Sequence, residues 1–200
     1  MKGSLIIVGF FVLGTICGVC HLLPFDIAET NISYYALCAL MFSVGLSVGN
    51  DPLTLKNFRS LNPRLVFLPI MTILGTLAGS AAVSLILTHR SITDCLAVGS
   101  GFGYYSLSSI FITEYKGAEL GTIALLANIS REILTLLAAP LLVRWFGNLA
   151  PISAGGATTM DTTLPIITRT AGQQFVVVSI FHGFVVDFSV PFLVTLFCSI

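Results

Sequence analysis

Long apolar runs separated by short polar segments divide the chain into lengths that suit a membrane. Runs close to the roughly 20 residues that cross a bilayer occupy positions 5–23, 33–49, 65–88, 118–143 and 174–199. We expect each run to form a transmembrane α-helix. The first run lacks the small-residue exit of a signal peptide and is longer than the usual signal-peptide core, so we expect it to be retained.

Two further segments are apolar but interrupted by small and polar residues. They read AVGSGFGYYSLSSIFI at residues 97–112 and SAGGATTMDTTLPIIT at residues 153–168. Backbone of this kind is tolerated at membrane depth where protein or a water-filled cavity satisfies its polar groups. We therefore predict an all-α polytopic membrane protein with about five full transmembrane helices and two broken or re-entrant segments that line a cavity.

The two broken segments begin similar units, which suggests an inverted repeat. Aligning Gly103 with Gly156 pairs a small and polar segment, a short charged turn and a span that carries one acid. In each unit an acid follows a glycine by 15 residues, Glu132 after Gly117 and Asp187 after Gly172. Repeats of opposite topology are common in secondary transporters. Chance resemblance between low-complexity apolar sequences is the alternative.

Charge and spacing suggest an arrangement of the parts. We expect residues 1–90 to form a three-helix N-terminal membrane part and residues 91–200 to form a transport core, within a single membrane domain. The loop at residues 50–64 carries Lys56, Arg59 and Arg64, whereas the loop after the first run carries no Lys or Arg. The positive-inside rule then predicts a cytoplasmic N-terminus and a periplasmic C-terminus.

The composition supports a membrane location and excludes several functions. Of the 200 residues, 56% are hydrophobic and 9% are charged, with a mean hydropathy of +0.98. The nine basic and nine acidic residues cancel, which leaves no polycationic surface for nucleic acid. Residues 17–21 read CGVCH, a haem-attachment pattern, but the motif ends an apolar helix without an obvious second ligand. We expect no nucleic acid, metal or cofactor.

Charged residues interrupt the span at residues 118–143, where the chain reads ANISREIL. A charged side chain near the bilayer centre costs about 2.5–3.5 kcal/mol on insertion scales. We therefore expect Arg131 and Glu132 to form interactions, structural or functional, that offset this cost. Asn128 and Glu132 share a helical face, while Arg131 lies about 100° away from Glu132. The functional interpretation is a cation site, and the alternative is a structural ion pair with a neighbouring helix.

The second broken segment offers an acid surrounded by hydroxyl groups. Asp161 lies among Thr158, Thr159, Thr162 and Thr163. These oxygens suit a cation or a proton, while the N–H groups of a half-helix beginning here suit a carboxylate. The alternative is a buried helix cap.

The first broken segment and the last span add further candidates. In GSGFGYYSLSS, the glycines suit close packing or binding equally, and we expect Tyr104 and Ser106 to face the cavity. His182 shares a span with Asp187, and the two could relay protons. A histidine that donates to a backbone carbonyl is the alternative.

The motifs SGFGYYSLSSI, ANISREI, GATTMDTTLPIITRT and HGF, in this order and spacing, resemble the lysine exporter (LysO) family of bacterial inner-membrane proteins. The resemblance implies export of L-lysine and its analogues, and it places Glu132 and Asp161 on the family's intramembrane acidic pair. Longer family members begin with about three further spans. The resemblance therefore also implies a separate small membrane protein as a partner, or self-association.

Together these features predict a secondary transporter rather than an enzyme. Glu132 and Asp161 would receive the ammonium groups of L-lysine, while Arg131 and half-helix N–H groups would bind its carboxylate. Exchange of a proton for the substrate on the acids would give proton antiport. The alternatives are an intramembrane aspartyl-type hydrolase, which needs two acids close together, and a haem-bearing electron carrier.

Overall fold

The chain forms two compact units, Met1–Val48 and Gly49–Ile200. The computed structural model describes residues 63–87 and 89–200, together with the isolated positions Leu13, Ile16, Cys17, Tyr35 and Phe42. The expected spans at residues 5–23 and 33–49 therefore lie outside the described residues, apart from these positions. The boundary after Val48 places the third expected span in the same unit as the helices that follow it.

Three helices of the described residues are long and apolar enough to cross a membrane, as the hydrophobic runs predicted. Helix α4 covers Phe67–Ser84 and follows a 3-10 turn, η2, at Pro63–Val66. Helix α7 covers Ala118–Phe146. Helix α10 covers Val176–Ser199 and follows the short turn η4 at Gln173–Phe175.

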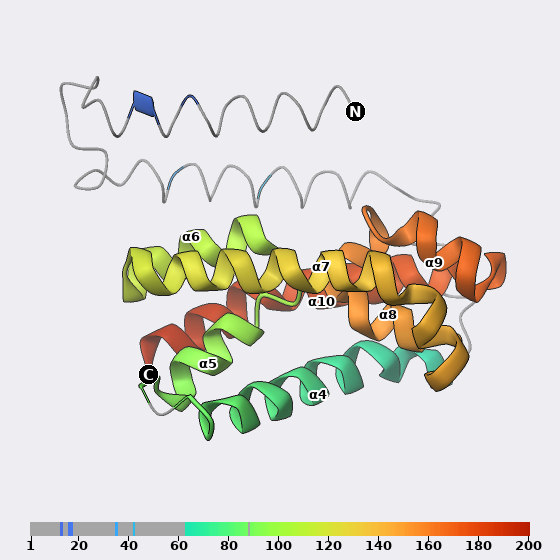
Figure 1. Cartoon of the computed structure of the whole chain (residues 1–200), viewed down its shortest axis with the longest axis horizontal. Coiled ribbons are helices and arrows are strands. Elements are labelled where there is room, and N and C mark those ends of the chain that lie inside the picture. Colours follow the sequence, from blue (N-terminus) through green and yellow to red (C-terminus); the bar gives the residue numbers. More distant parts are fainter. Residues whose placement is uncertain (1–12, 14–15, 18–34, 36–41, 43–62, 88) are drawn as a thin grey trace. The chain divides into compact units, whose positions relative to one another are not determined.

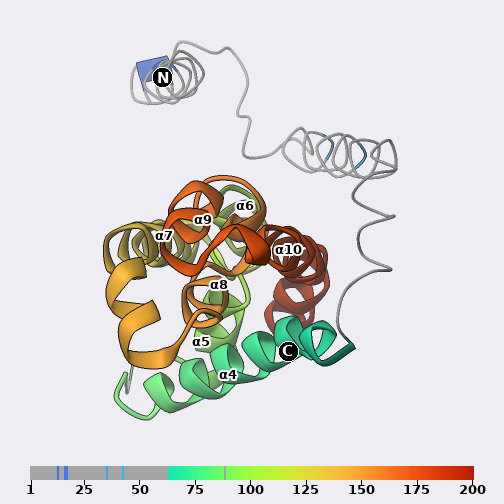
Figure 2. The same ribbon diagram turned by 90° about the vertical axis from the view of Figure 1, so that its right-hand side faces the viewer.

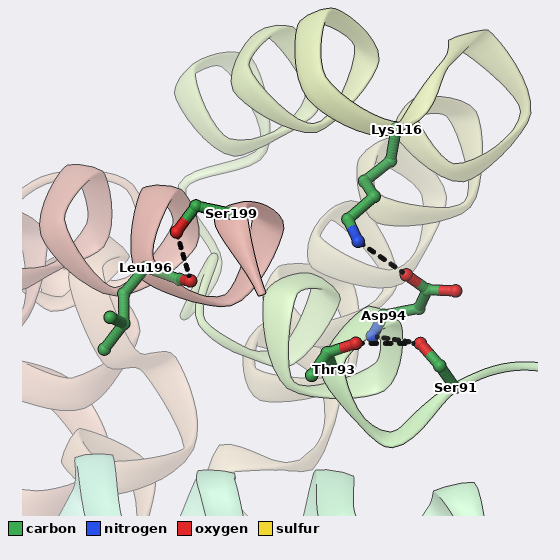
Figure 3. Close-up of polar contacts among 6 residues, drawn as sticks. All are labelled: Ser91, Thr93, Asp94, Lys116, Leu196 and Ser199. Carbon is green, nitrogen blue, oxygen red and sulfur yellow. Dashed lines mark hydrogen bonds and ion pairs between the residues drawn. The ribbon is translucent and has the colours of Figure 1, made fainter.

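The first broken segment is a helical hairpin made of α5, Ile92–Gly99, and α6, Tyr105–Lys116. Ser91 caps α5 by accepting a hydrogen bond from the backbone N–H of Asp94, and Nζ of Lys116 lies 3.8 Å from Oδ1 of Asp94 (Figure 3). A second ion pair joins Arg90 to Glu119 at the start of α7. These contacts hold both outer ends of the hairpin at one end of the bundle.

The second broken segment is a hairpin made of α8, Ala150–Gly155, the 3-10 turn η3, Gly156–Met160, and α9, Leu164–Ala171. Its outer ends meet in one hydrophobic cluster, in which buried Ile152 of α8 packs with Ile167 and Ala171 of α9 and Val178 of α10. Leu65 and Leu68 from the beginning of the third span complete this cluster. Both ends of α8–α9 therefore lie beside the start of α4 and of α10.

The two hairpins enter the bundle from opposite ends. In Figure 1, α4 and α10 run from right to left and α7 runs from left to right, while α5–α6 enters from the left and α8–α9 from the right. Viewed along the bundle in Figure 2, α5 and α8 lie in the middle, between α4, α7 and α10. Both segments therefore enter and return without crossing. The two broken segments that the sequence predicted are thus present as opposed hairpins, and the inverted repeat of the surrounding units stays a prediction.

Candidate functional site

The tips of the two hairpins cross inside the bundle. The backbone N–H of Ala157 donates to the carbonyl of Phe102 at 2.9 Å, which joins η3 to the loop at residues 100–104. Gly156 has a φ of +63°, and a Cβ built on it would lie 2.2 Å from the Phe102 carbonyl oxygen. Gly103, its partner in the sequence repeat, also has positive φ, at +95°. Both the left-handed backbone and the close approach require glycine at this crossing.

Asn128 of α7 satisfies the broken backbone of the first hairpin. Its Oδ1 accepts from the N–H of Gly103 at 2.7 Å, and its Nδ2 donates to the carbonyls of Val98 at 3.3 Å and Ala124 at 2.9 Å. The side chain is 3% exposed, so its bond to Gly103 replaces water for an N–H group that the helix break leaves without an intrahelical partner. Asn128 therefore has a structural function that its pairing with Glu132 in the sequence did not indicate.

Arg131 of α7 forms hydrogen bonds with the backbone of the second hairpin, as Asn128 does with the first. Its Nε donates to the carbonyl of Ala154 at 2.8 Å and its Nη2 to that of Ser153 at 3.0 Å, both near the C-terminal end of α8. Its guanidinium also lies 5.9 Å from the centre of the Phe102 ring. Arg131 thus contacts the tips of both hairpins. None of the described ion pairs includes Arg131, whose other polar contact is the Thr76 hydroxyl at 3.4 Å.

Acidic groups gather around the crossing from two elements. Asp161 follows η3 directly and is exposed, and Thr162 donates its backbone N–H to the Asp161 carboxylate. Asp187 of α10 is 6% exposed. The two acids belong to elements that pack against each other, η3 and α10. The second broken segment and the last span thus bring Asp161 and Asp187 to the same part of the bundle.

Glu132 is the third candidate acid. It is partly buried on α7, and among the described residues it forms no hydrogen bond or ion pair. The structural ion pair considered from the sequence is therefore absent from this part of the chain. Ser106 is partly buried in the first turn of α6, and Thr162 is exposed beside Asp161.

His182 connects two elements through hydroxyl groups rather than through Asp187. Its Nε2 lies 2.9 Å from the hydroxyl of Thr72 on α4, and its Nδ1 lies 3.3 Å from that of Thr159 in η3. Thr159 is fully buried, and its hydroxyl lies 2.8 Å from the carbonyl oxygen of Gly156 and 2.9 Å from that of Ser179, so its one proton is shared between these two acceptors. Thr72, like Thr76 and Phe102, did not stand out in the sequence, because a single threonine or phenylalanine in an apolar run carries no distinctive pattern.

Comparison with known proteins adds a family to this geometry. The profile of the family described as "Lysine exporter LysO" matches residues 8–198. The chain is 36% identical over 196 residues to "Lysine exporter LysO" of Escherichia coli, covering 98% of this chain and 64% of that protein. It is 34% identical over 196 residues to a "Putative lysine exporter" of Haemophilus influenzae, covering 98% of this chain and 96% of that protein.

The chain thus spans a little under two thirds of the length of the Escherichia coli relative. No solved structure matches it. The family match nevertheless extends over both hairpins and all three described spans. The chain belongs to the lysine exporter LysO family.

Proposed function

We propose that this protein is a secondary transporter that exports L-lysine across the bacterial inner membrane. The observation that carries the proposal is the crossing of two opposed helical hairpins inside the bundle, joined by the hydrogen bond from Ala157 to Phe102. Broken helices of opposite topology place substrate and ion sites near the bilayer midplane in many transporters. The names of the two relatives supply the substrate.

The ammonium groups of the substrate bind to Glu132 and Asp161 in this proposal. Asp161 is exposed where η3 ends, which leaves its carboxylate accessible beside the crossing. Glu132 forms no ion pair among the described residues, so its charge is available to a cation. Asp187 adds a third carboxyl group on α10, which packs against η3, the turn that ends at Asp161. Lysine carries two ammonium groups, which makes a site with several acids suitable.

The substrate carboxylate requires donors, and the beginnings of α6 and α9 provide them. Each helix starts beside the crossing, at Tyr105 and Leu164, and runs outward to its own end of the bundle (Figure 1). The N–H groups of a first helical turn have no intrahelical partners and carry partial positive charge. Tyr104, Ser106 and Thr162 lie at these two helix starts and complete the polar surroundings.

Export against a gradient requires an energy source, and we propose proton antiport. A carboxyl group that binds a proton loses its attraction for an ammonium group, so protonation from outside releases lysine and deprotonation inside restores the site. Asp187 and His182 are candidates for the proton path. His182 bridges Thr72 of α4 and Thr159 of η3, so its contacts join a full span to the broken segment.

The other candidate functions receive less support. The hydrolase alternative has no support from the two relatives, which are both named as exporters. A small membrane protein or a second copy of this chain remains our prediction for the partner.

Counterflow of labelled L-lysine into liposomes that hold the purified protein tests the proposal. We expect uptake of label when the vesicles are preloaded with unlabelled lysine, and stimulation by an imposed proton gradient. Vesicles without protein and vesicles preloaded with glutamate are the controls. Lysine counterflow no faster than in the protein-free vesicles would contradict the transport proposal, while counterflow that ignores the proton gradient would contradict antiport alone.

A further inference from the structure

A cavity of about 830 Å³ lies between α4, α5 and α7. Its volume is within the roughly 300–1,000 Å³ that is usual for small-molecule pockets. Neither Glu132 nor Asp161 lines it, so it is separate from the acids of the proposed transport site. Asn128 and Arg131 line it near the hairpin crossing, and Arg90 and Asp94 line it near one end of the bundle.

The walls between these two ends are mainly apolar. They include Val83 of α4, Val98 of α5 and Ile123 of α7. At the end of the bundle, Arg90 pairs with Glu119 and Asp94 pairs with Lys116, so opposite charges are balanced there (Figure 3 shows the second pair). The cavity therefore joins a polar, charge-balanced mouth to a cationic inner end.

The charge at the inner end indicates what the cavity binds. The described partners of the Arg131 guanidinium are neutral oxygens, namely the carbonyls of Ser153 and Ala154 and the hydroxyl of Thr76. A cation among apolar walls attracts an anion, and no ion pair within the part of the chain that the structure describes compensates the charge of Arg131. A lipid chain entering from the membrane would bring a methyl end to the guanidinium and leave that charge unbalanced. A small carboxylate satisfies it.

The mouth provides a complementary group for a cationic side chain. Asp94 and Gly99 both line the cavity and are separated by five residues of α5, which is about 7.5 Å along a helix axis. Gly99 lies at the inner end, because Thr76, whose hydroxyl is 3.4 Å from Nη1 of Arg131, has its methyl group 3.8 Å from the Cβ position of Gly99. An extended amino acid with its carboxylate near Arg131 would therefore direct its side chain along the apolar wall toward Asp94. There an ammonium group can replace Lys116, which lies 3.8 Å from the Asp94 carboxylate.

We propose that this cavity is a second subsite for the transported cationic amino acid, in which Arg131 binds the α-carboxylate and Asp94 receives the side-chain ammonium. The inference rests on the proposed transport of lysine. The subsite would bind the substrate between one end of the bundle and the hairpin crossing, before or after the substrate occupies the transport site. Asn128 lines the same inner end, and the apolar wall contacts the methylene groups of the side chain.

Cys95 provides a probe inside the cavity, because it lines the wall next to Asp94. In a variant whose other cysteines (Cys17, Cys20, Cys38 and Cys198) are replaced by alanine, a cationic methanethiosulfonate reagent should label Cys95 from water. L-lysine should slow this labelling severalfold at saturation. Norleucine, which lacks the side-chain ammonium, and cadaverine, which lacks the carboxylate, should protect much less.

Two substitutions separate occupancy of the cavity from damage to the fold. Val83→Trp fills the cavity from α4 and should abolish protection by lysine and slow counterflow, whereas Leu74→Trp is the matched control on the same helix. Both residues are exposed aliphatic side chains, and Leu74 does not line the cavity.

A third substitution tests the role of Asp94. Asp94→Asn should weaken protection by lysine and leave the weaker effect of norleucine unchanged, because norleucine has no side-chain ammonium group for Asp94.

The outcomes distinguish this subsite from the transport proposal itself. Normal lysine counterflow together with unprotected or unreactive Cys95 would overturn the subsite and leave transport intact. Protection by norleucine equal to that by lysine would overturn the role of Asp94. Absence of both counterflow and protection in the unsubstituted chain would count against the proposed function and the subsite together.

Discussion

At the scale of single residues, the hairpin crossing depends on Gly156. A methyl group at this position would lie 2.2 Å from the Phe102 carbonyl oxygen, and a φ of +63° is unfavourable for alanine. We predict that Gly156→Ala lowers the melting temperature of the purified protein strongly or prevents its accumulation. Gly75→Ala is the control, since nothing lies within 4 Å of its Cβ position in α4. It should be neutral or stabilising by up to about 1 kcal/mol. Equal stability of the two variants would contradict the crossing.

A second prediction at the scale of single residues concerns Asn128. Asn128→Ala removes the acceptor of the Gly103 N–H and a donor to Val98, inside a buried site. The Val98 carbonyl still accepts from the Gly101 N–H at 3.3 Å, but the Gly103 N–H loses its Asn128 acceptor. Leaving a buried N–H without a partner costs about 1–3 kcal/mol, so thermal stability should fall clearly. Ser130→Ala, at an exposed position of the same helix, should have little effect. Size-exclusion chromatography in detergent after heating measures the melting temperature of both variants. A melting temperature of Asn128→Ala equal to that of the unsubstituted protein would contradict the hydrogen bonds described for this side chain.

At the scale of the elements, the sequence predicted the breaks and the third, fourth and fifth spans because both signals are local. Clusters of Gly, Thr and Pro within an apolar run favour a break, whereas single prolines such as Pro140 and Pro191 lie inside α7 and α10. The matching positive φ angles of Gly103 and Gly156 agree with the alignment of the repeat. The bonds of Arg131 were not predictable, because its acceptors lie 22 and 23 positions away and approach only when α8 packs against α7. The cavity likewise combines residues of three helices.

The opposed hairpins give a prediction about sidedness. Cysteines introduced at Ser91 and Lys116, the outer ends of α5–α6, should react with an impermeant reagent from one side of the membrane. Cysteines at Asn148 and Gln173, beside the outer ends of α8–α9, should react from the other side. Labelling in intact cells and in inverted vesicles measures this. Reaction of Ser91→Cys and Lys116→Cys from different sides would mean that the first segment crosses the membrane.

At the scale of the whole molecule, the distribution of basic residues predicts the orientation. Lys56, Arg59 and Arg64 should hold their loop in the cytoplasm, and the direction of α10 then places Ile200 in the periplasm (Figure 1). Alkaline phosphatase fused after Ile200 should be active and a fluorescent protein fused there should be dark. The same reporters inserted into the loop at residues 50–64 should give the opposite pattern. A bright fusion after Ile200 would reverse the proposed direction.

The account of the whole molecule as an exporter depends most on Glu132 and Asp161. Their amides keep the size of each side chain and remove its charge, and no described ion pair contains either residue. Stability should therefore change little. A structural ion pair would behave differently, because loss of one partner from a buried pair costs about 3–5 kcal/mol and would deplete the protein.

The most direct measurement is lysine efflux and membrane abundance, determined together in cells that carry Glu132→Gln or Asp161→Asn. We predict that each variant accumulates near the unsubstituted level and loses lysine efflux. Glu114→Gln is the control, at an exposed acid of α6 that neither described ion pair contains, and it should retain efflux. Normal efflux from both Glu132→Gln and Asp161→Asn would contradict the proposed mechanism.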